Sequence, residues 1–140
     1  MDRKGHVIWK GDIKTGTGVL SVGSGALKET KYGFRTRFEN ETGTNPEELI
    51  AAAHAGCFSM ALSGILGEAG FKPETIETTA TVSVEKSDMG FTITRSHLET
   101  TVKAAGLDEK NLKELTQKAK EGCPVSRALK LEMSVDARLG

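Results

Sequence analysis

Short stretches of alternating apolar and polar residues, separated by glycines, open the chain. Alternation with a period of two is typical of strands that bury one face, and the glycines mark turns between them. The first forty residues therefore predict an antiparallel meander of three strands, at residues 6–10, 17–22 and 32–39.

The longest apolar stretch follows Asn45 and Pro46. Asparagine caps helices and proline suits the first helical position, so a helix is predicted to begin here, to run to about Ala69 and to close at Gly70. Its apolar residues fall on every face, and such a helix must be covered all round. One sheet in a chain of this length covers only one side, which indicates a dimer.

The second half predicts a hairpin, two helices and a last strand. Alternation over residues 76–84 leads to a turn at 87–90 and a second arm at 91–103. In that arm the apolar phase slips by one position, which indicates a bulge near residues 95–97. The remaining predicted elements are a helix from Asp108 to about Gly122, a short helix from Pro124, and a strand at 131–139 with one solvent-exposed face. The fold class is α+β.

Composition narrows the function classes. The chain has 140 residues, 19 basic and 19 acidic, without a run of like charge, which argues for one domain (1–140) and against a nucleic-acid partner. Residues 1–10 lack the apolar core of a secretory signal. Residues 49–66 include His54, two serines and a glycine, so they are expected to form a buried helix rather than a membrane span. We expect a cytoplasmic protein.

The two cysteines, Cys57 and Cys123, have no metal-ligand spacing, and in a reducing compartment a disulfide between them would be transient and redox-active. Cys57 lies within the long helix, where a cysteine is usually an inert apolar residue with a raised pKa. Cys123 precedes Pro124 at a helix start, where amides and the helix dipole favour a thiolate. The residues alone favour Cys123 as the nucleophile.

Three further polar side chains are candidates. His54 lies one turn before Cys57 and could pair with it, but no third group orients it, which favours a core histidine with satisfied hydrogen bonds. Arg35 and Arg37 share a face of the predicted strand, so either could stabilise a thiolate or both could lie on a solvated face. Glu47 is by default a favourable charge at a helix start.

The sequence resembles the OsmC/Ohr family of hydroperoxide reductases over nearly its whole length. The resemblance implies antiparallel sheets wrapped around two long central helices in an intertwined homodimer. It also implies that Cys57 is the peroxidatic cysteine, Cys123 the resolving one, and that Arg37 and Glu47 form the polar pair that activates Cys57. The matching motifs are Tyr32-Gly33-Phe34, Thr36-Arg37-Phe38-Glu39, Gly43-Thr44-Asn45-Pro46-Glu47-Glu48-Leu49-Ile50, Ala53-His54-Ala55, Cys57-Phe58-Ser59-Met60-Ala61-Leu62-Ser63 and Gly122-Cys123-Pro124-Val125-Ser126.

The activity implied by this resemblance is reduction of organic hydroperoxides through a Cys57 sulfenic acid and a Cys57–Cys123 disulfide. An external dithiol, for which the family suggests dihydrolipoyl groups, would reduce the disulfide; no metal or other cofactor is expected. Ile50, Phe58 and Met60 agree with a preference for bulky organic peroxides. Two alternatives remain: a Cys57/His54 thiol hydrolase, and a non-catalytic redox sensor.

Helix geometry predicts where the site is assembled. Glu47 and Cys57 are ten residues apart, about 15 Å along a helix and about 80° apart around it. If two copies of the helix cross antiparallel at Ala52, Glu47 of one chain lies beside Cys57 of the other. Composite sites in an obligate homodimer are therefore expected.

Overall fold

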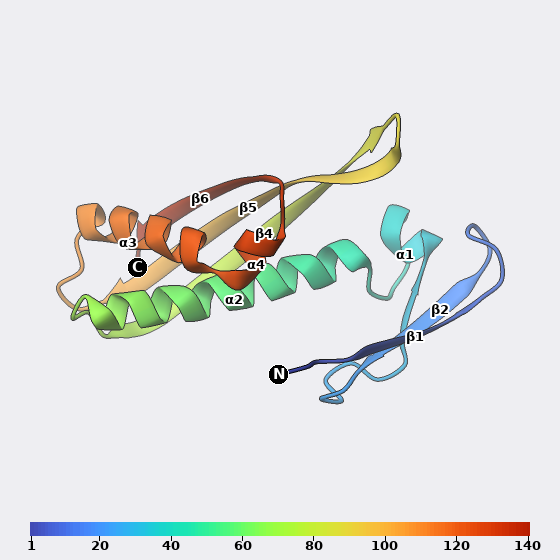
Figure 1. The fold of residues 1–140 in the computed structure, drawn as a ribbon, viewed down its shortest axis with the longest axis horizontal. Helices are drawn as coiled ribbons and strands as arrows, with labels where there is room; N and C mark the ends of the chain where they lie inside the picture. The colour runs from blue at the N-terminus through green and yellow to red at the C-terminus, as the bar shows by residue number, and fades with distance from the viewer. The chain divides into compact units, whose positions relative to one another are not determined.

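The computed structural model describes residues 1–140 and has the α+β class that the sequence predicts (Figure 1). Contacts within the chain group into two compact units, Met1–Leu49 and Ile50–Gly140, which are described separately below. The single domain inferred from length stays a prediction.

The first unit contains the predicted antiparallel meander, and its strand order is β1-β2-β3. The strands are β1 (Gly5–Lys10), β2 (Thr17–Val22) and β3 (Thr30–Gly33). Trp9 and Tyr32 pack with ring centroids 5.5 Å apart. Gly18 lies beneath both rings, and a Cβ there would approach the Tyr32 ring to 2.2 Å. A glycine is therefore required at this point of the sheet.

The predicted strand at residues 32–39 is wrong after Gly33, because the next residues form the short helix α1 (Phe34–Phe38). Thr36 is buried, and its hydroxyl accepts the Gly33 amide at 2.9 Å and donates to the Thr44 carbonyl at 2.8 Å. Pairs one helical turn apart also support α1, namely the Phe34 and Phe38 rings and the Arg35–Glu39 ion pair. Arg35 and Arg37 consequently do not share a face, since side chains two apart on a helix point about 160° away from each other.

The long helix α2 (Pro46–Glu68) has the predicted ends. The Asn45 side-chain oxygen accepts the Glu48 amide at 2.8 Å, which caps the first turn. At the other end Gly70 has a φ of 86°, and the Phe71 amide donates to the Leu66 carbonyl at 2.9 Å. This left-handed glycine is the expected helix stop.

The second unit contains a three-stranded sheet in the order β4-β5-β6, made of β4 (Pro73–Ser87), β5 (Gly90–Ala104) and β6 (Glu132–Leu139). The hairpin of β4 and β5 is confirmed, with the bulge at Thr94, one residue before the predicted range. β6 pairs parallel to β5, so this sheet is mixed rather than wholly antiparallel. A parallel neighbour needs a crossover connection, which α3 (Glu109–Gly122) and α4 (Pro124–Ala128) provide.

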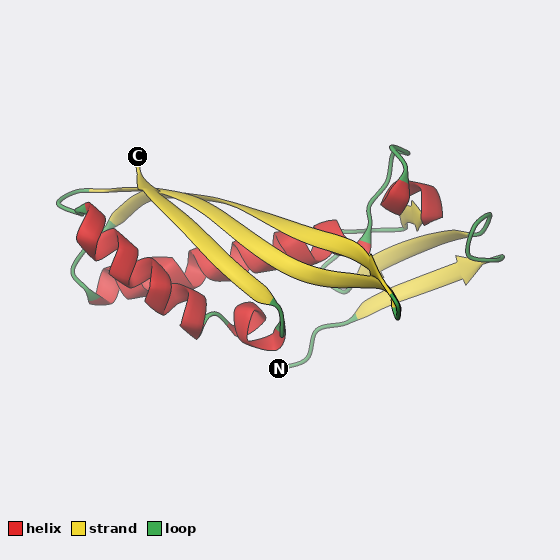
Figure 2. Ribbon diagram, turned by 90° about the horizontal axis from the view of Figure 1, so that it is seen from above, coloured by secondary structure: helices red, strands yellow, loops and turns green.

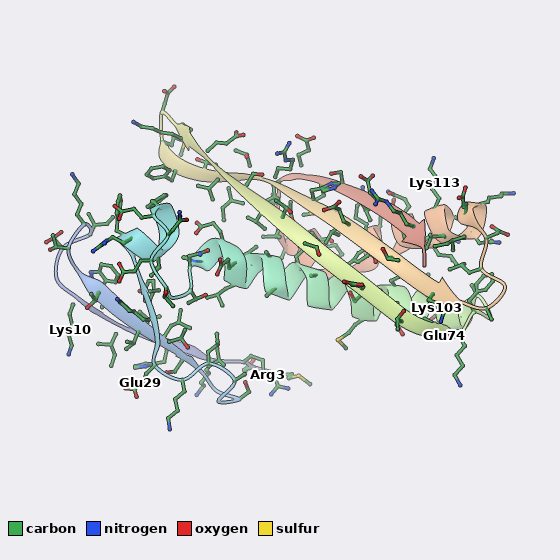
Figure 3. All side chains as sticks on the ribbon, turned by 180° about the vertical axis from the view of Figure 1, so that it is seen from behind. Arg3, Lys10, Glu29, Glu74, Lys103 and Lys113 are labelled. Carbon is green, nitrogen blue, oxygen red and sulfur yellow. The ribbon has the colours of Figure 1, made fainter.

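The core of the second unit lies between the sheet and the helices on one of its faces (Figure 2). On β5 the even-numbered side chains from Ser96 to Val102 are buried against the helices. The opposite face is polar, and Glu74 and Lys103 form a 3.0 Å ion pair across its end (Figure 3). The main apolar core residues are Phe58, Leu62, Leu66, Leu98, Val102, Leu112, Leu115 and Ala119.

Most of α2 is uncovered within one chain. Its buried residues form a single stripe at every fourth position, His54, Phe58, Leu62 and Leu66. By length and composition alone, α2 is also the one helix that could cross a membrane, with a mean hydropathy of 1.7. Core helices of soluble proteins pass the same test, so this is weak evidence for a span. The all-round burial predicted for α2 is not supplied by this chain.

Candidate functional site

The fold brings the two cysteines together. Cys57 projects from the middle of α2 and is half-buried, while Cys123 joins α3 to α4 and is fully buried. Both are free thiols, and they hydrogen-bond to each other. Residues 66 positions apart therefore form one dithiol site.

The two thiols differ in acidity. Burial raises the pKa of Cys57, against the effect of the Val125 amide, which hydrogen-bonds to its sulfur; the neighbouring Cys123 thiol raises that pKa further. Burial also acts to raise the pKa of Cys123, but hydrogen bonds from the Ser126 amide, the Cys57 thiol and the Ser126 hydroxyl outweigh it, and the pKa is lowered. Within this unit the hydrogen bonds therefore favour a thiolate at Cys123 over one at Cys57, in agreement with the helix-start argument.

His54 is the core histidine that the sequence favoured. It is fully buried, and both ring nitrogens are engaged: Nδ1 lies 2.7 Å from the Ser96 hydroxyl and Nε2 lies 2.8 Å from the Ser126 hydroxyl. Burial lowers the pKa of His54, so the ring stays neutral near pH 7. A histidine committed to two serines is not free to act as a base for Cys57, which argues against the thiol hydrolase.

The first unit brings Arg37 and Glu47 together. The Arg37 Nη2 and Nε atoms donate to the same Glu47 oxygen at 2.6 and 2.9 Å. Glu47 is the less exposed partner, with 13% of its side chain accessible against 32% for Arg37. Arg35, which is 66% exposed, pairs instead with Glu39 at 3.1 Å and Glu41 at 3.4 Å. Only one of the two candidate arginines is thus held by Glu47.

An aromatic hollow of about 340 Å³ lies beside Arg37 in the same unit. This hollow was not predicted from the sequence, although aromatic residues on both sides of Arg37 were a usable signal. Ile50, Phe58 and Met60 were the apolar residues expected near the site; of these, Phe58 is fully buried in the core stripe of α2. The lining consists of Trp9, Ile13, Tyr32, Gly33, Phe34, Arg37, Phe38 and Pro46.

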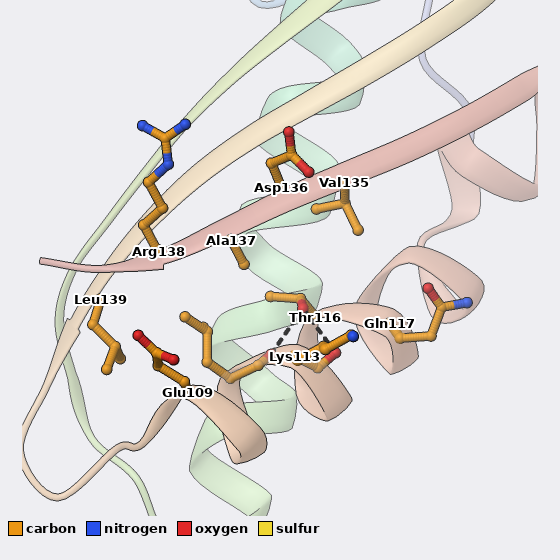
Figure 4. A pocket seen from close by; sticks show the side chains of 10 residues that line it. Glu109, Lys113, Thr116, Gln117, Val135, Asp136, Ala137, Arg138 and Leu139 are labelled. Carbon is orange, nitrogen blue, oxygen red and sulfur yellow. Dashed lines mark hydrogen bonds between the residues drawn. The ribbon is translucent and has the colours of Figure 1, made fainter.

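A second hollow, of about 780 Å³, lies between α3 and β6 (Figure 4). It is lined by charged and amide side chains such as Glu109, Lys113 and Arg138. Thr116 at its floor donates to carbonyls of its own helix. It contains no cysteine, and no group of three or more His, Cys, Asp or Glu side chains in the chain could hold a metal ion. The nucleophiles therefore lie elsewhere.

Residues 39–138 match the family model described as OsmC-like protein. The chain is 56% identical over 137 residues to the protein named Peroxiredoxin OsmC of Escherichia coli (strain K12), which covers 98% of this chain and 96% of that one. It is 35% identical over 102 residues to the organic hydroperoxide resistance protein OhrB of Bacillus subtilis (strain 168), covering 72% and 73%.

Solved structures agree with these matches. The crystal structure of OhrB of Bacillus subtilis superposes with a TM-score of 0.70 at 28% identity, covering 98% of both chains. An OsmC-like protein of unknown function from Vibrio cholerae superposes with a TM-score of 0.77 at 15% identity, covering 98% of this chain and 99% of that one, which bears on the fold alone.

Proposed function

Because the chain belongs to the OsmC-like protein family, we propose that it is a peroxiredoxin-type thiol peroxidase that reduces organic hydroperoxides to alcohols. The observation that carries this proposal is the contact between the Cys57 and Cys123 thiols. A dithiol that can close into a disulfide supplies the two electrons that cleavage of one peroxide O–O bond consumes.

The cycle starts with attack of the Cys57 thiolate on the distal peroxide oxygen. The O–O bond breaks, the alkoxide takes up a proton and leaves as the alcohol, and Cys57 becomes a sulfenic acid. The Cys123 thiolate then attacks the Cys57 sulfur, the S–S bond forms, the S–O bond breaks, and the hydroxide takes a proton from solvent and leaves as water. An external dithiol, for which we propose dihydrolipoyl groups, reduces the disulfide by two thiol–disulfide exchanges.

Arg37 is proposed to make Cys57 reactive. Burial raises the pKa of Cys57, so a nearby cation is needed to favour its thiolate. The two donor atoms of Arg37 on one Glu47 oxygen hold the guanidinium in a defined orientation. Cys57, Cys123, Arg37 and Glu47 are the proposed site residues.

We propose that this site is composite in a homodimer. Glu47 and Cys57 lie on one continuous helix and are separated by about 15 Å along its axis, too far to serve one arginine in the same chain. The uncovered face of α2 includes Ala52, Gly56 and Met60 at four-residue spacing. The small residues of this stripe, Ala52 and Gly56, allow a second copy of α2 to approach closely, and the exposed Met60 can pack against it. Each site would then take its cysteines from one chain and its ion pair from the other.

The aromatic hollow beside Arg37 supports an organic substrate. Its lining is largely apolar, and an alkyl or aryl group bound there would place its peroxide near the guanidinium. Hydrogen peroxide offers no such group, so a preference for bulky organic peroxides follows. We further propose that residues 1–140 act as one OsmC-like domain, in the cytoplasm, without a nucleic-acid or membrane partner.

A peroxidase assay with cumene hydroperoxide and hydrogen peroxide side by side tests this function. With excess dithiol, repeated turnover is expected, and faster with cumene hydroperoxide. A single round of oxidation without turnover would instead identify a redox sensor. Ester cleavage that does not depend on Cys123 would identify a thiol hydrolase.

Replacing Arg37 by alanine is expected to raise the pKa of Cys57 by about one to three units and to slow peroxide attack, because the thiolate loses its cation. Arg35→Ala is the matched control, since Arg35 pairs with Glu39 and Glu41 rather than Glu47. Thiolate absorbance titrated in a Cys123→Ser background measures the pKa of Cys57 alone. A larger effect of Arg35→Ala would transfer the activating role to Arg35.

A further inference from the structure

A chain of buried hydrogen bonds leads from the sheet to the resolving thiol. It runs from Ser96 on β5 through His54 on α2 to Ser126 on α4, with heavy-atom distances of 2.7 and 2.8 Å at the two histidine nitrogens. The Ser126 hydroxyl then hydrogen-bonds to the Cys123 sulfur. Ser96, His54 and Cys123 are fully buried, and Ser126 is 7% exposed. The proposed peroxidase mechanism gives His54 no role.

Counting protons leaves two possible donor-to-acceptor directions for this series of hydrogen bonds. Each serine hydroxyl has one proton to donate, and neutral histidine has one N–H. In the first direction Ser96 donates to Nδ1, Nε2–H donates to Ser126, and Ser126 donates to the Cys123 sulfur. In the reverse direction Nδ1–H donates to Ser96, and Ser126 gives its only proton to Nε2. The Cys123 sulfur then has no hydroxyl donor.

The first direction fits the Cys123 thiolate better. A thiolate can only accept hydrogen bonds, so the Ser126 hydroxyl must donate to it, and Ser126 must then accept from Nε2–H. The lowered pKa of His54 is consistent with the neutral ring that both directions need. The other groups that act on Cys123 are the Ser126 and Val125 amides and the Cys57 thiol. The histidine tautomer therefore decides whether Cys123 receives the hydroxyl proton.

We propose that His54 is a positioning residue for the resolving step: held by Ser96, it keeps the Ser126 hydroxyl as a donor to Cys123 and so stabilises the thiolate form of Cys123. This inference rests on the proposed peroxidase function. The thiolate attacks the Cys57 sulfenic acid, an S–S bond forms, and the S–O bond breaks. The hydroxide takes a proton from solvent and leaves as water. The same donor stabilises Cys123 as the leaving thiolate when the disulfide is reduced.

The decisive measurement is the pKa of Cys123 by thiolate absorbance in a Cys57→Ser background, which leaves one thiol to titrate. Ser126→Ala is expected to raise this pKa by about one to two units, because a hydrogen bond to the charged form is lost. His54→Leu should raise it by about half a unit to one unit, because Ser126 loses the donor that aligns it. His54→Gln should stay near the parent value, since its side-chain amide can still donate to Ser126.

The sign of the His54→Leu effect separates the two directions. If Ser126 donated to Nε2 in the parent, removing the ring would free the hydroxyl for Cys123 and lower the pKa. An unchanged or lowered pKa in His54→Leu, or a Gln variant that behaves like the Leu variant, overturns the proposal. Thr100→Val is the matched control, because this buried β5 residue bonds to Thr78 and not to His54, and it should leave the pKa unchanged.

Folding defects are controlled by Ser96→Ala, a small change three hydrogen bonds away from the Cys123 sulfur. It should raise the Cys123 pKa by less than His54→Leu does, and no rise in a folded Ser96→Ala chain counts against the proposal. In the protein with both cysteines, His54→Leu should form sulfenic acid at the parent rate but close the disulfide several-fold more slowly. A parent that forms no sulfenic acid refutes the peroxidase, while the titration still decides the role of His54.

Discussion

Cys57→Ser is expected to abolish peroxide reduction, whereas Cys123→Ser should consume one equivalent of peroxide without further turnover and then over-oxidise at Cys57. Only Cys57 is half-buried, while Cys123 is fully buried, so peroxide can reach only the Cys57 sulfur. Without Cys123 the sulfenic acid cannot be resolved, and a second peroxide oxidises it to sulfinic acid. Intact-mass spectrometry after stepwise addition of peroxide distinguishes the two products.

Access of peroxide to the sulfur and acidity of the thiol favour different cysteines as the nucleophile. Within its own unit Cys123 has the lower pKa and would be the nucleophile if acidity decided. A buried thiolate without a path for the substrate is nevertheless inert towards peroxide. If Cys57→Ser retains multiple turnovers and Cys123→Ser is dead from the first equivalent, the two roles are reversed.

Mixing two inactive variants is expected to restore activity. A Cys57→Ser chain keeps its Arg37–Glu47 pair, and a Glu47→Ala chain keeps its cysteines. After joint refolding from denaturant, each mixed dimer would contain one intact composite site. With half of the dimers mixed and one of two sites intact in each, about a quarter of the parent activity should return.

Two further mixtures serve as controls. Arg37→Ala in place of Glu47→Ala should complement equally, because both residues belong to one ion pair. A mixture of Cys57→Ser with Cys57→Ser,Glu47→Ala should stay inactive, since no chain in it carries Cys57. No recovery in the first mixture, or an active monomer, would show that a chain supplies its own Arg37 and Glu47.

Local signals in the sequence determined much of the fold. Asn45, Pro46 and Gly70 bound α2, and Asp108 caps α3, because caps act through residues within one turn. The lowered pKa of Cys123 also followed from its place before Pro124. The bulge in β5 followed from a phase slip that adjacent positions reveal. Each of these features depends on neighbours a few residues away.

Tertiary structure decided what depends on distant partners. Alternation alone predicted a strand at residues 34–38, but the buried Thr36 hydroxyl reaches the Thr44 carbonyl and favours a helix. The pairing of β6 with β5 was likewise set by the crossover through α3 and α4. His54 could be placed on a helix from sequence, but its link to Ser126 spans 72 positions. The periodic spacing of apolar residues along the chain carries no information on such contacts, because the contacts form only when separate elements pack together.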